Sequence, residues 1–439
     1  MTIIRPETEM KESGASWMGK VPCRWSISKL KWYLRRTDPR NPGSKQVLSL
    51  YREYGVIPKD SRDDNHNATS EDTSKYKYVR VGDFVVNKMK AWQGSVAVSE
   101  YEGIVSPAYY VYHFTDDSYH KRYFHYLLRS CYKEEFMRLS GGIRVGQWDL
   151  SSNDLDNILV VIPKKDEQQA IADYLDKTCS KIDEIIAEAK ASIDEYKELK
   201  QSVITQTVTM NNHTKLMETG NKILPKLPIS WNLVRVKNLF FNEEKPLRVG
   251  PFGSQLTTKD YLDSGYWVYT QRSVLDNNFA TNDIFISDEK YEKLKAFAVK
   301  ENDILITTRG SGTPGHVAKV PRNYKKGILH PCLMRFRLDE DKCLYEYLRF
   351  VFEFSTYIRE QIDSASNTTA IPVLYSDTLK NLYMPLPSIE EQKEIIEKLI
   401  TFEKKIDSLI TEKESLINDL EAYKKSLIYE VVTGKRRVV

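Results

Sequence analysis

The sequence has few of the motifs by which enzymes are recognised. It contains no G-x-x-x-x-G-K-[ST] phosphate loop, no H-E-x-x-H pair and no Asn-Pro-Pro-aromatic or Asp-Pro-Pro-aromatic run of the kind that amino-methyltransferases use. The seven histidines are scattered, and the five cysteines never occur in C-x-x-C spacing. We therefore predict no catalytic residue and no metal site, and a reduced cytoplasmic setting rather than a disulfide framework.

Long apolar runs are also missing. The mean hydropathy is −0.50, and no stretch approaches the ~20 apolar residues that cross a bilayer, which excludes an integral membrane protein. The N-terminal residues Met1-Thr-Ile-Ile-Arg-Pro lack the apolar core of a secretory signal. At roughly 150 residues per domain, the length predicts two or three domains with cores of their own.

What the sequence does contain is an internal duplication. Residues 155–169 recur as residues 379–393 at an offset of 224, and the likeness continues without a gap for more than fifty positions. Gly103–Pro107 and Gly327–Pro331 share the same offset. Each copy therefore has a variable front, residues 1–164 or 211–387, and a more faithful back.

The two backs are predicted to be long helices, at 165–210 and 388–439. Residues 166–209 and 390–433 contain no proline or glycine, and their apolar residues follow the alternating steps of three and four that are typical of a coiled coil. Ser388–Glu391 has the pattern of a capping box at the second helix start. The predicted seams are Leu175, Ile182, Ile185, Ala189, Tyr196, Leu199 and Val203, and Leu399, Phe402, Ile406, Leu409, Leu416, Leu420, Tyr423 and Leu427.

The fronts combine β-branched runs with short helical patterns. We therefore expect an α+β fold in which two pseudo-repeated α/β domains are separated by two long antiparallel coiled-coil helices. The antiparallel arrangement is inferred because it returns the chain to a neighbouring front after each helix.

Charge divides along the same lines. Residues 166–209 hold ten acidic and five basic residues, and residues 390–433 hold eleven and seven. The rest of the chain holds 53 basic and 40 acidic residues, so the fronts are basic. A basic front suits a phosphate backbone, although an ordinary solvated surface explains the charge equally well.

Several loops of the fronts place basic or amide side chains beside small residues. Such side chains read base edges or contact phosphates, although a structural role within the loop is an equal alternative for each residue. Gly310–Gly315 fits G-x-G-x-x-G, but a strand is predicted after it, so we expect a loop between strands rather than a dinucleotide site. The candidate DNA contacts are Asn87, Lys88, Lys90, Gln93, Arg144 and Gln147 in the first front, and Arg248, Ser254, Gln255, Arg272, Thr308, Arg309, Ser311 and Thr368 in the second.

The repeated order of front and helix resembles the specificity subunit of type I restriction–modification systems. The likeness covers essentially the whole chain, and the duplicated pattern is more specific than any single motif. The residues that carry it are Ile162-Pro163 with Glu167-Gln168, Leu386-Pro387 with Glu391-Gln392, the Pro22–Trp25 segment that Pro228–Trp231 repeats, and Val432-Thr433-Gly434-Lys435.

The resemblance implies a protein without catalytic activity that binds double-stranded DNA through two target-recognition domains. Two modification subunits, carrying S-adenosylmethionine, would dock on the helices and methylate adenine N6 once in each strand. Two restriction subunits, dependent on ATP and magnesium, would complete a nuclease in a prokaryotic cytoplasm, associated with the nucleoid. This chain would bind no cofactor, and its candidate partner-binding residues are Glu167, Gln168, Glu391 and Gln392.

Two other functions remain open from the sequence. A coiled-coil scaffold with two protein-binding modules would show the same duplication without a role in DNA binding. A nuclease that acts alone is the third alternative, and no motif supports it.

The different fronts predict different half-sites, and hence a bipartite, non-palindromic DNA site whose gap depends on helix length. Inserting four residues into each helix adds ~6 Å, close to two base-pair steps. We expect methylome sequencing to find a wider gap between two unchanged half-sites. An unchanged gap would show that the helices do not set the spacing.

Overall fold

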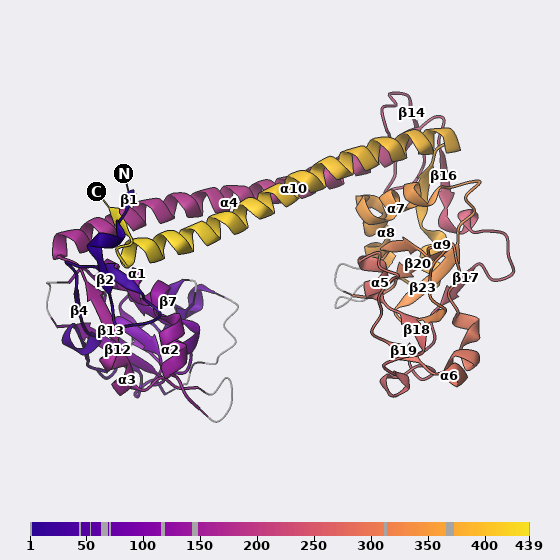
Figure 1. Cartoon of the computed structure of the whole chain (residues 1–439). Coiled ribbons are helices and arrows are strands. Elements are labelled where there is room, and N and C mark those ends of the chain that lie inside the picture. The colour runs from indigo at the N-terminus through magenta and orange to yellow at the C-terminus, as the bar shows by residue number, and fades with distance from the viewer. Residues whose placement is uncertain are drawn as a thin grey trace. The chain divides into compact units, whose positions relative to one another are not determined.

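The computed structural model describes residues 2–43, 45–52, 54–62, 69, 72–115, 119–142, 148–310, 314–365 and 373–438. The chain forms two compact units (Figure 1). The first unit comprises Met1–Lys190 and Glu414–Val439, and the second comprises Ala191–Lys413. Two long helices, α4 (Lys165–Thr209) and α10 (Ile389–Val432), each contribute one half to each unit. The expected α+β class with two long helices is confirmed.

A four-stranded antiparallel sheet forms the core of the first unit. Its order is β10-β9-β12-β5, and α1 (Lys121–Cys131), α2 (Lys133–Leu139) and α3 (Ser152–Asn157) accompany it. Every residue of β9 is buried, as expected of a central strand covered on both faces. The strands are β5 (Leu34–Arg36), β9 (Phe84–Asn87), β10 (Val96–Val98) and β12 (Tyr109–Phe114).

The second unit repeats this sheet in the order β17-β23-β20-β21. Because β20 pairs antiparallel with β21, Gly310–Gly315 connects two strands, as the sequence predicts; residues 311–313 lie outside the described part of the chain. A three-stranded sheet, β19-β18-β22, is added. The strands are β17 (Leu247–Val249), β18 (Tyr266–Tyr269), β19 (Phe285–Ile286), β20 (Asp303–Thr307), β21 (Val317–Lys319), β22 (Gly327–Leu329) and β23 (Leu333–Arg337), and the helices are α5 (Gln271–Leu275), α6 (Asp288–Lys293), α7 (Tyr345–Phe354), α8 (Thr356–Ala365) and α9 (Ser376–Asn381).

Two-stranded ribbons join these sheets to the long helices. In both units the strand just before a long helix pairs with the strand that follows a Pro-x-x-Trp segment, which is β13 with β4 in the first unit and β24 with β16 in the second. The ribbons are β1 (Thr2–Ile4) with β25 (Arg436–Val438), β2 (Met10–Glu12) with β3 (Lys20–Pro22), β4 (Ser26–Lys29) with β13 (Leu159–Ile162), β6 (Leu48–Tyr51) with β7 (Gly55–Pro58), β8 (Lys77–Val79) with β11 (Gly103–Val105), β14 (Leu216–Glu218) with β15 (Lys226–Pro228), and β16 (Asn232–Arg235) with β24 (Tyr383–Leu386).

The two ends of the chain meet in the first unit (Figure 1). Besides the pairing of β1 with β25, the Arg5 amide donates to the Lys435 carbonyl at 2.8 Å. In the second unit the corresponding place is occupied by continuous chain, because α4 runs through residues 210–215 into β14. In the first unit the end of the long helix is therefore joined to the start of the domain by strand pairing, and in the second unit it is joined by the chain itself.

The long helices are antiparallel in both units. In the first unit Lys424 of α10 binds Asp183 of α4, with Nζ and Oδ1 2.6 Å apart. In the second unit Lys200 of α4 binds Asp407 of α10 at 2.8 Å. The start of each helix thus lies beside the end of the other, as the sequence predicts.

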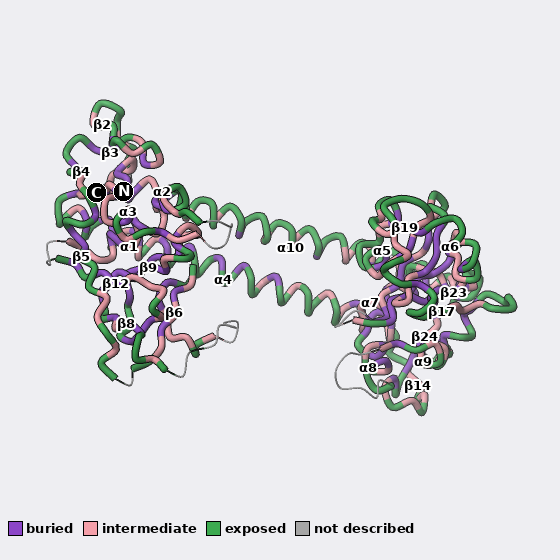
Figure 2. Tube along the Cα trace, turned by 90° about the horizontal axis from the view of Figure 1, so that it is seen from below, coloured by how far each residue is buried: buried purple, intermediate pink, exposed green. Residues whose placement is uncertain are grey.

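The apolar seam of these helices differs from the predicted one. Exposed residues outnumber buried ones along both helices, whose tubes are mainly green between the two units (Figure 2). The predicted seam residues Ile185, Leu199, Leu416 and Tyr423 are exposed, so their assignment is wrong. Ile186 and Ile417, one residue after Ile185 and Leu416, point about 100° further round their helices and are buried instead. Leu199 and Tyr423 are followed by Lys200 and Lys424, which bond aspartates of the other helix. The observed buried seam residues include Leu175, Cys179, Ile182, Ile186, Ala189 and Ile193 in α4, and Ile395, Leu399, Ile406, Ile417 and Leu427 in α10.

Ion pairs of one arginine with two glutamates connect α7 to α10 in the second unit. Arg349 Nη2 lies 2.8 Å from Glu403 Oε2, and Arg349 Nη1 lies 3.2 Å from Glu353 Oε2. Burial raises the pKa of Glu353 to about 7, although Arg349 opposes this shift. Arg349 and Lys200 instead lower the pKa of Glu403, against the effect of its burial.

This raised pKa predicts a pH dependence of folding. A carboxyl group whose pKa is about 7 when folded and near its ordinary value of 4.5 when unfolded stabilises the protein at low pH, and this contribution is lost between those two pH values. Between pH 5 and pH 8 the unfolding free energy of the unaltered chain should therefore fall by roughly 1 kcal/mol or more relative to that of Glu353→Gln, which has no carboxyl group at this position. Chemical denaturation at both pH values would measure it. Parallel pH dependences would contradict the shift.

Candidate nucleic-acid interface

Loops of the second unit converge at one end of its four-stranded sheet, where β20 ends and β23 begins. The Gly250 amide donates to the Leu333 carbonyl at 2.9 Å, and the Thr308 amide donates to the Cys332 carbonyl at 3.0 Å. The side chain of Gln271, at the start of α5, donates to the Arg309 carbonyl. We call residues 248–255, 271–272 and 308–309 the second recognition edge. It unites six of the predicted DNA contacts, namely Arg248, Ser254, Gln255, Arg272, Thr308 and Arg309.

The side chains of this edge differ in how far they face solvent. Ser254 and Arg309 are exposed, and Arg272 is exposed with its Nε 3.5 Å from Asp276 Oδ2. Gln255 uses its side-chain oxygen to accept from the Phe252 amide at 3.1 Å. Thr308 is only 4% exposed, which leaves almost none of its surface for DNA, so its prediction as a direct DNA contact is corrected.

A polar hollow of about 380 Å³ adjoins the edge. It is lined by Arg272 together with Asp276, Asn278 and Asp283, and by the hydroxyl groups of nearby Thr and Ser residues. Guanidinium, amide and hydroxyl groups are hydrogen-bonding partners of phosphates and base edges.

The first unit has an equivalent edge where β9 ends. The Lys88 amide donates to the Ala108 carbonyl at 3.2 Å, and the Leu150 amide donates to the Lys88 carbonyl at 3.0 Å. In the second unit Thr308 makes the same two bonds with Cys332 and Leu374, which lie 224 positions after Ala108 and Leu150. We call residues 87–93 with 148–150 the first recognition edge. The backbone framework of the two edges is the same, whereas the side chains at matching positions differ.

The predicted contacts of the first recognition edge have different environments. Lys90 is exposed, Lys88 Nζ lies 2.8 Å from Asp149 Oδ2, and Gln93 accepts from Arg52 Nη2 at 3.0 Å. Asn87 is 8% exposed and its Oδ1 accepts from the Met89 amide at 3.2 Å, so its prediction as a direct contact is corrected to a structural role. Arg144 and Gln147, like Ser311 and Thr368 of the second unit, lie outside the described residues.

Two basic residues near this edge were missed by the sequence analysis. The guanidinium of Arg36 lies 4.5 Å from the centre of the Tyr110 ring, and Lys77 Nζ lies 5.6 Å from it. Lys88 is close enough to influence the pKa of Tyr110 as well, which burial raises. The adjacent Arg35-Arg36 pair was the available signal, but Lys77 comes from a distant strand, so no local pattern joins them.

The four predicted partner-binding residues all make hydrogen bonds that hold the starts of the long helices. Trp25 Nε1 donates to Glu167 Oε2 at 3.0 Å, and Trp231 Nε1 donates to Glu391 Oε2 at 2.8 Å. The other carboxylate oxygen of Glu167 accepts from Arg5 Nη2 at 2.6 Å, whereas that of Glu391 lies 2.6 Å from His213 Nε2. The role of Glu167 and Glu391 in binding a partner stays a prediction. Their role within the chain, which sequence analysis missed, is to attach each helix start to a buried tryptophan.

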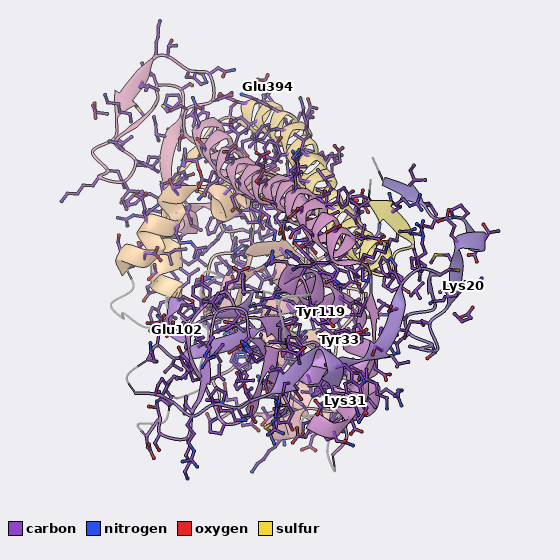
Figure 3. The ribbon with its side chains drawn as sticks, turned by 90° about the vertical axis from the view of Figure 1, so that its left-hand side faces the viewer. Lys20, Lys31, Tyr33, Glu102, Tyr119 and Glu394 are labelled. Carbon is purple, nitrogen blue, oxygen red and sulfur yellow. The ribbon has the colours of Figure 1, made fainter. Side chains whose placement is uncertain are left out.

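The neighbouring glutamines are buried. Gln168 accepts from the His120 amide at 2.9 Å and donates to the Pro163 carbonyl at 3.0 Å, and it is 1% exposed. Gln392 makes the matching bonds with Leu344 and Pro387 and is fully buried. Their prediction as partner contacts is therefore corrected, because no surface of either side chain is available. Beside His120, the Tyr119 ring packs edge-on against Tyr33 with centroids 4.5 Å apart (Figure 3).

Two buried tyrosines complete the attachment. Tyr123 of α1 donates to the carbonyl of Val161 at 3.0 Å and lies 3.2 Å from that of Val432, at the end of α10. Tyr347 of α7 makes the same contacts with Pro385 and with Val208, near the end of α4. Each unit therefore holds the start of one long helix and the end of the other.

The comparison with protein families decides among the alternatives. The model of the type I restriction modification DNA specificity domain matches residues 41–195 and 249–419, which is more than half of the chain. The chain belongs to the type I restriction–modification DNA specificity family. It is therefore a type I specificity subunit, a protein of DNA sequence recognition.

Individual relatives span nearly the whole length of this specificity subunit. The type I restriction enzyme MjaVIII specificity subunit of Methanocaldococcus jannaschii is 24% identical, over 95% of this chain and 94% of its own. The solved HsdS subunit of Thermoanaerobacter tengcongensis has a TM-score of 0.53 at 16% identity, over 94% of this chain and 98% of its own. A chain of the structure described as "Structural basis underlying complex assembly and conformational transition of the type I R-M system" has a TM-score of 0.69 at 14% identity, over 94% and 99%. These structures show that the fold is shared.

In the part of the specificity subunit that the structure describes, no helix is long and apolar enough to cross a membrane.

Removing one buried glutamine should destabilise the specificity subunit. Gln168→Ala leaves the His120 amide and the Pro163 carbonyl without their partner, so we expect a loss of roughly 1–3 kcal/mol in unfolding free energy. The adjacent Gln169→Ala is a matched control, because Gln169 is exposed and its side chain bonds Asp173 of its own helix; its effect should stay within about 0.5 kcal/mol. Equal effects in denaturant titrations would contradict the anchoring role of Gln168.

Proposed function

We propose that this specificity subunit recognises a bipartite, asymmetric double-stranded DNA site, with one half-site for each recognition edge. The observation that carries the proposal is the equivalence of the two edges. Lys88 and Thr308 make the same two backbone hydrogen bonds, to partners that lie 224 positions apart (Ala108 and Cys332, Leu150 and Leu374), although their own side chains differ. Because the two edges share one backbone framework, we expect them to dock on DNA in a similar way. Because their side chains differ at the same position, we expect them to read different bases.

We assign the chemistry to partner subunits. Two modification subunits with bound S-adenosylmethionine would methylate adenine N6, one adenine in each strand, and two restriction subunits would use ATP and magnesium to cleave unmodified DNA. The acidic long helices support a docking role, because their charge disfavours contact with DNA and leaves their outer faces to proteins. Flipping the target base out of the helix would then belong to the modification subunits.

Methylome mapping tests this proposal. The full chain would be co-expressed with its cognate modification subunit, and N6-methyladenine would be mapped across the host genome. We expect a split motif with one modified adenine on each strand. A stable complex that adds no methylation would contradict the proposal. A scaffold without a DNA role would also lack the steep loss of DNA affinity with salt that phosphate contacts produce.

Arg309 offers a test of one half-site. It is exposed at the second recognition edge, and an arginine that reads guanine contributes about 1–3 kcal/mol of discrimination. Arg309→Ala should therefore relax the second half-site alone, as measured by methylome sequencing and by binding to duplexes with single substitutions. Arg322→Ala is the matched control, since Arg322 is exposed just after β21, near the opposite end of β20. If Arg309→Ala has the specificity of the unaltered chain, Arg309 does not read a base of the second half-site.

A further inference from the structure

One aromatic residue of the second recognition edge faces solvent almost completely. Phe252 is 78% exposed, more than any other large apolar side chain among the residues that the structure describes. A phenylalanine in this position forgoes the stabilisation that burial of its ring would bring. Single exposed apolar side chains are common on protein surfaces, so the position of Phe252 and the turn that carries it decide whether its ring has a function.

The turn that carries Phe252 is closed by hydrogen bonds. The Gln255 amide donates to the Phe252 carbonyl at 2.8 Å, and the Phe252 amide donates to Gln255 Oε1 at 3.1 Å. Pro251 on one side and Leu256 on the other are buried. With both backbone polar groups of Phe252 engaged and both flanks anchored, the ring projects from a defined turn.

The base of the turn is fixed against the sheet. Gly250 donates to Leu333, and a Cβ atom at Gly250 would lie 2.2 Å from the His330 carbonyl oxygen, so only glycine fits there. Arg248 lies in β17, two residues before this glycine, and the Thr308 amide bonds the carbonyl of Cys332, next to Leu333. Phe252 therefore belongs to the same end of the sheet as the basic side chains of the second recognition edge.

The first unit has no such residue at the matching place. β5 occupies the position in its sheet that β17 occupies in the second, and residues 37–43 follow β5 as residues 250–255 follow β17. The segment Thr-Asp-Pro-Arg-Asn-Pro-Gly contains no aromatic residue. The exposed ring is thus a feature of one recognition edge and not of the shared framework.

We propose that Phe252 is an apolar wedge that enters the DNA duplex between two stacked base pairs of the second half-site. The proposal rests on the proposed function. A phenyl ring has no hydrogen-bonding group with which to read a base edge, but it can replace part of the stacking that it disrupts. Insertion is easiest at flexible pyrimidine–purine steps, so the second half-site should contain a TA or CA/TG step that the first half-site does not need.

Fluorescence of 2-aminopurine tests the wedge, since this base brightens when it loses its stacked neighbour. The full chain in complex with its modification subunit would be bound to duplexes that carry the split motif found by methylome mapping. In each duplex 2-aminopurine would replace one base of the second half-site, other than the adenine that is methylated. We expect one step to brighten. Phe252→Ala should abolish this signal and weaken binding roughly tenfold, whereas Phe252→Leu should retain much of both, because bulky aliphatic side chains also act as wedges.

Phe241→Ala serves as the matched control. Phe241 is also an exposed phenylalanine of the second unit, but its amide bonds Arg337, at the opposite end of β23 from Leu333. Its signal and affinity should equal those of the unaltered chain.

The outcomes separate the wedge from the function on which it rests. If the unaltered complex methylates and binds a split site but no step brightens, the wedge is overturned and the proposed function stands. Weaker binding of Phe252→Ala without any brightening in the unaltered complex would also overturn it, in favour of a contact with the groove surface. If the unaltered complex shows no specific site at all, both fall.

Discussion

The structure depends on the buried hydrogen bonds that hold the ends of the two long helices. Each helix is shared between two units, so neither unit has a complete core without segments that are distant in the sequence. Trp25 and Trp231 bind the glutamates at the helix starts, and Gln168 and Gln392 satisfy backbone groups beside them. Such groups are costly to leave unpaired when buried, so the helix starts are specified closely.

The side chains of the two recognition edges can vary because backbone hydrogen bonds form their framework. Their backbone bonds are made by amides and carbonyls, which every non-proline residue supplies whatever its side chain. Lys88 and Thr308 therefore occupy the same place in the framework with different chemistry. A protein built in this way can change the bases that it reads without changing its fold, which is consistent with relatives that share the fold at 14–16% identity.

The site was predictable where a local pattern carried it. Arg272, at the start of α5, and Arg309, in the loop after β20, are both exposed at one end of the sheet, as the composition of these segments suggested. Asn87 and Thr308 are buried although they are polar, because each lies at a strand end where the loop packs back on the sheet. The cluster of Arg36 and Lys77 around Tyr110 joins distant strands, and neither the spacing nor the composition of the sequence could reveal that proximity.

The sequence by itself determined the duplication and the two long helices, because a repeat offset and a period near 3.6 residues are properties of the chain alone. Their antiparallel pairing was inferred from the order of the segments, since each helix returns the chain to a neighbouring front. Only the tertiary structure decided which apolar residue enters the seam. Ile185 and Ile186 are alike in hydrophobicity and differ by about 100° in direction, so the partner surface selects between them. The tertiary structure likewise decided that Gln168 and Gln392 face inward, since a polar side chain is stable there only where distant backbone groups complete its hydrogen bonds.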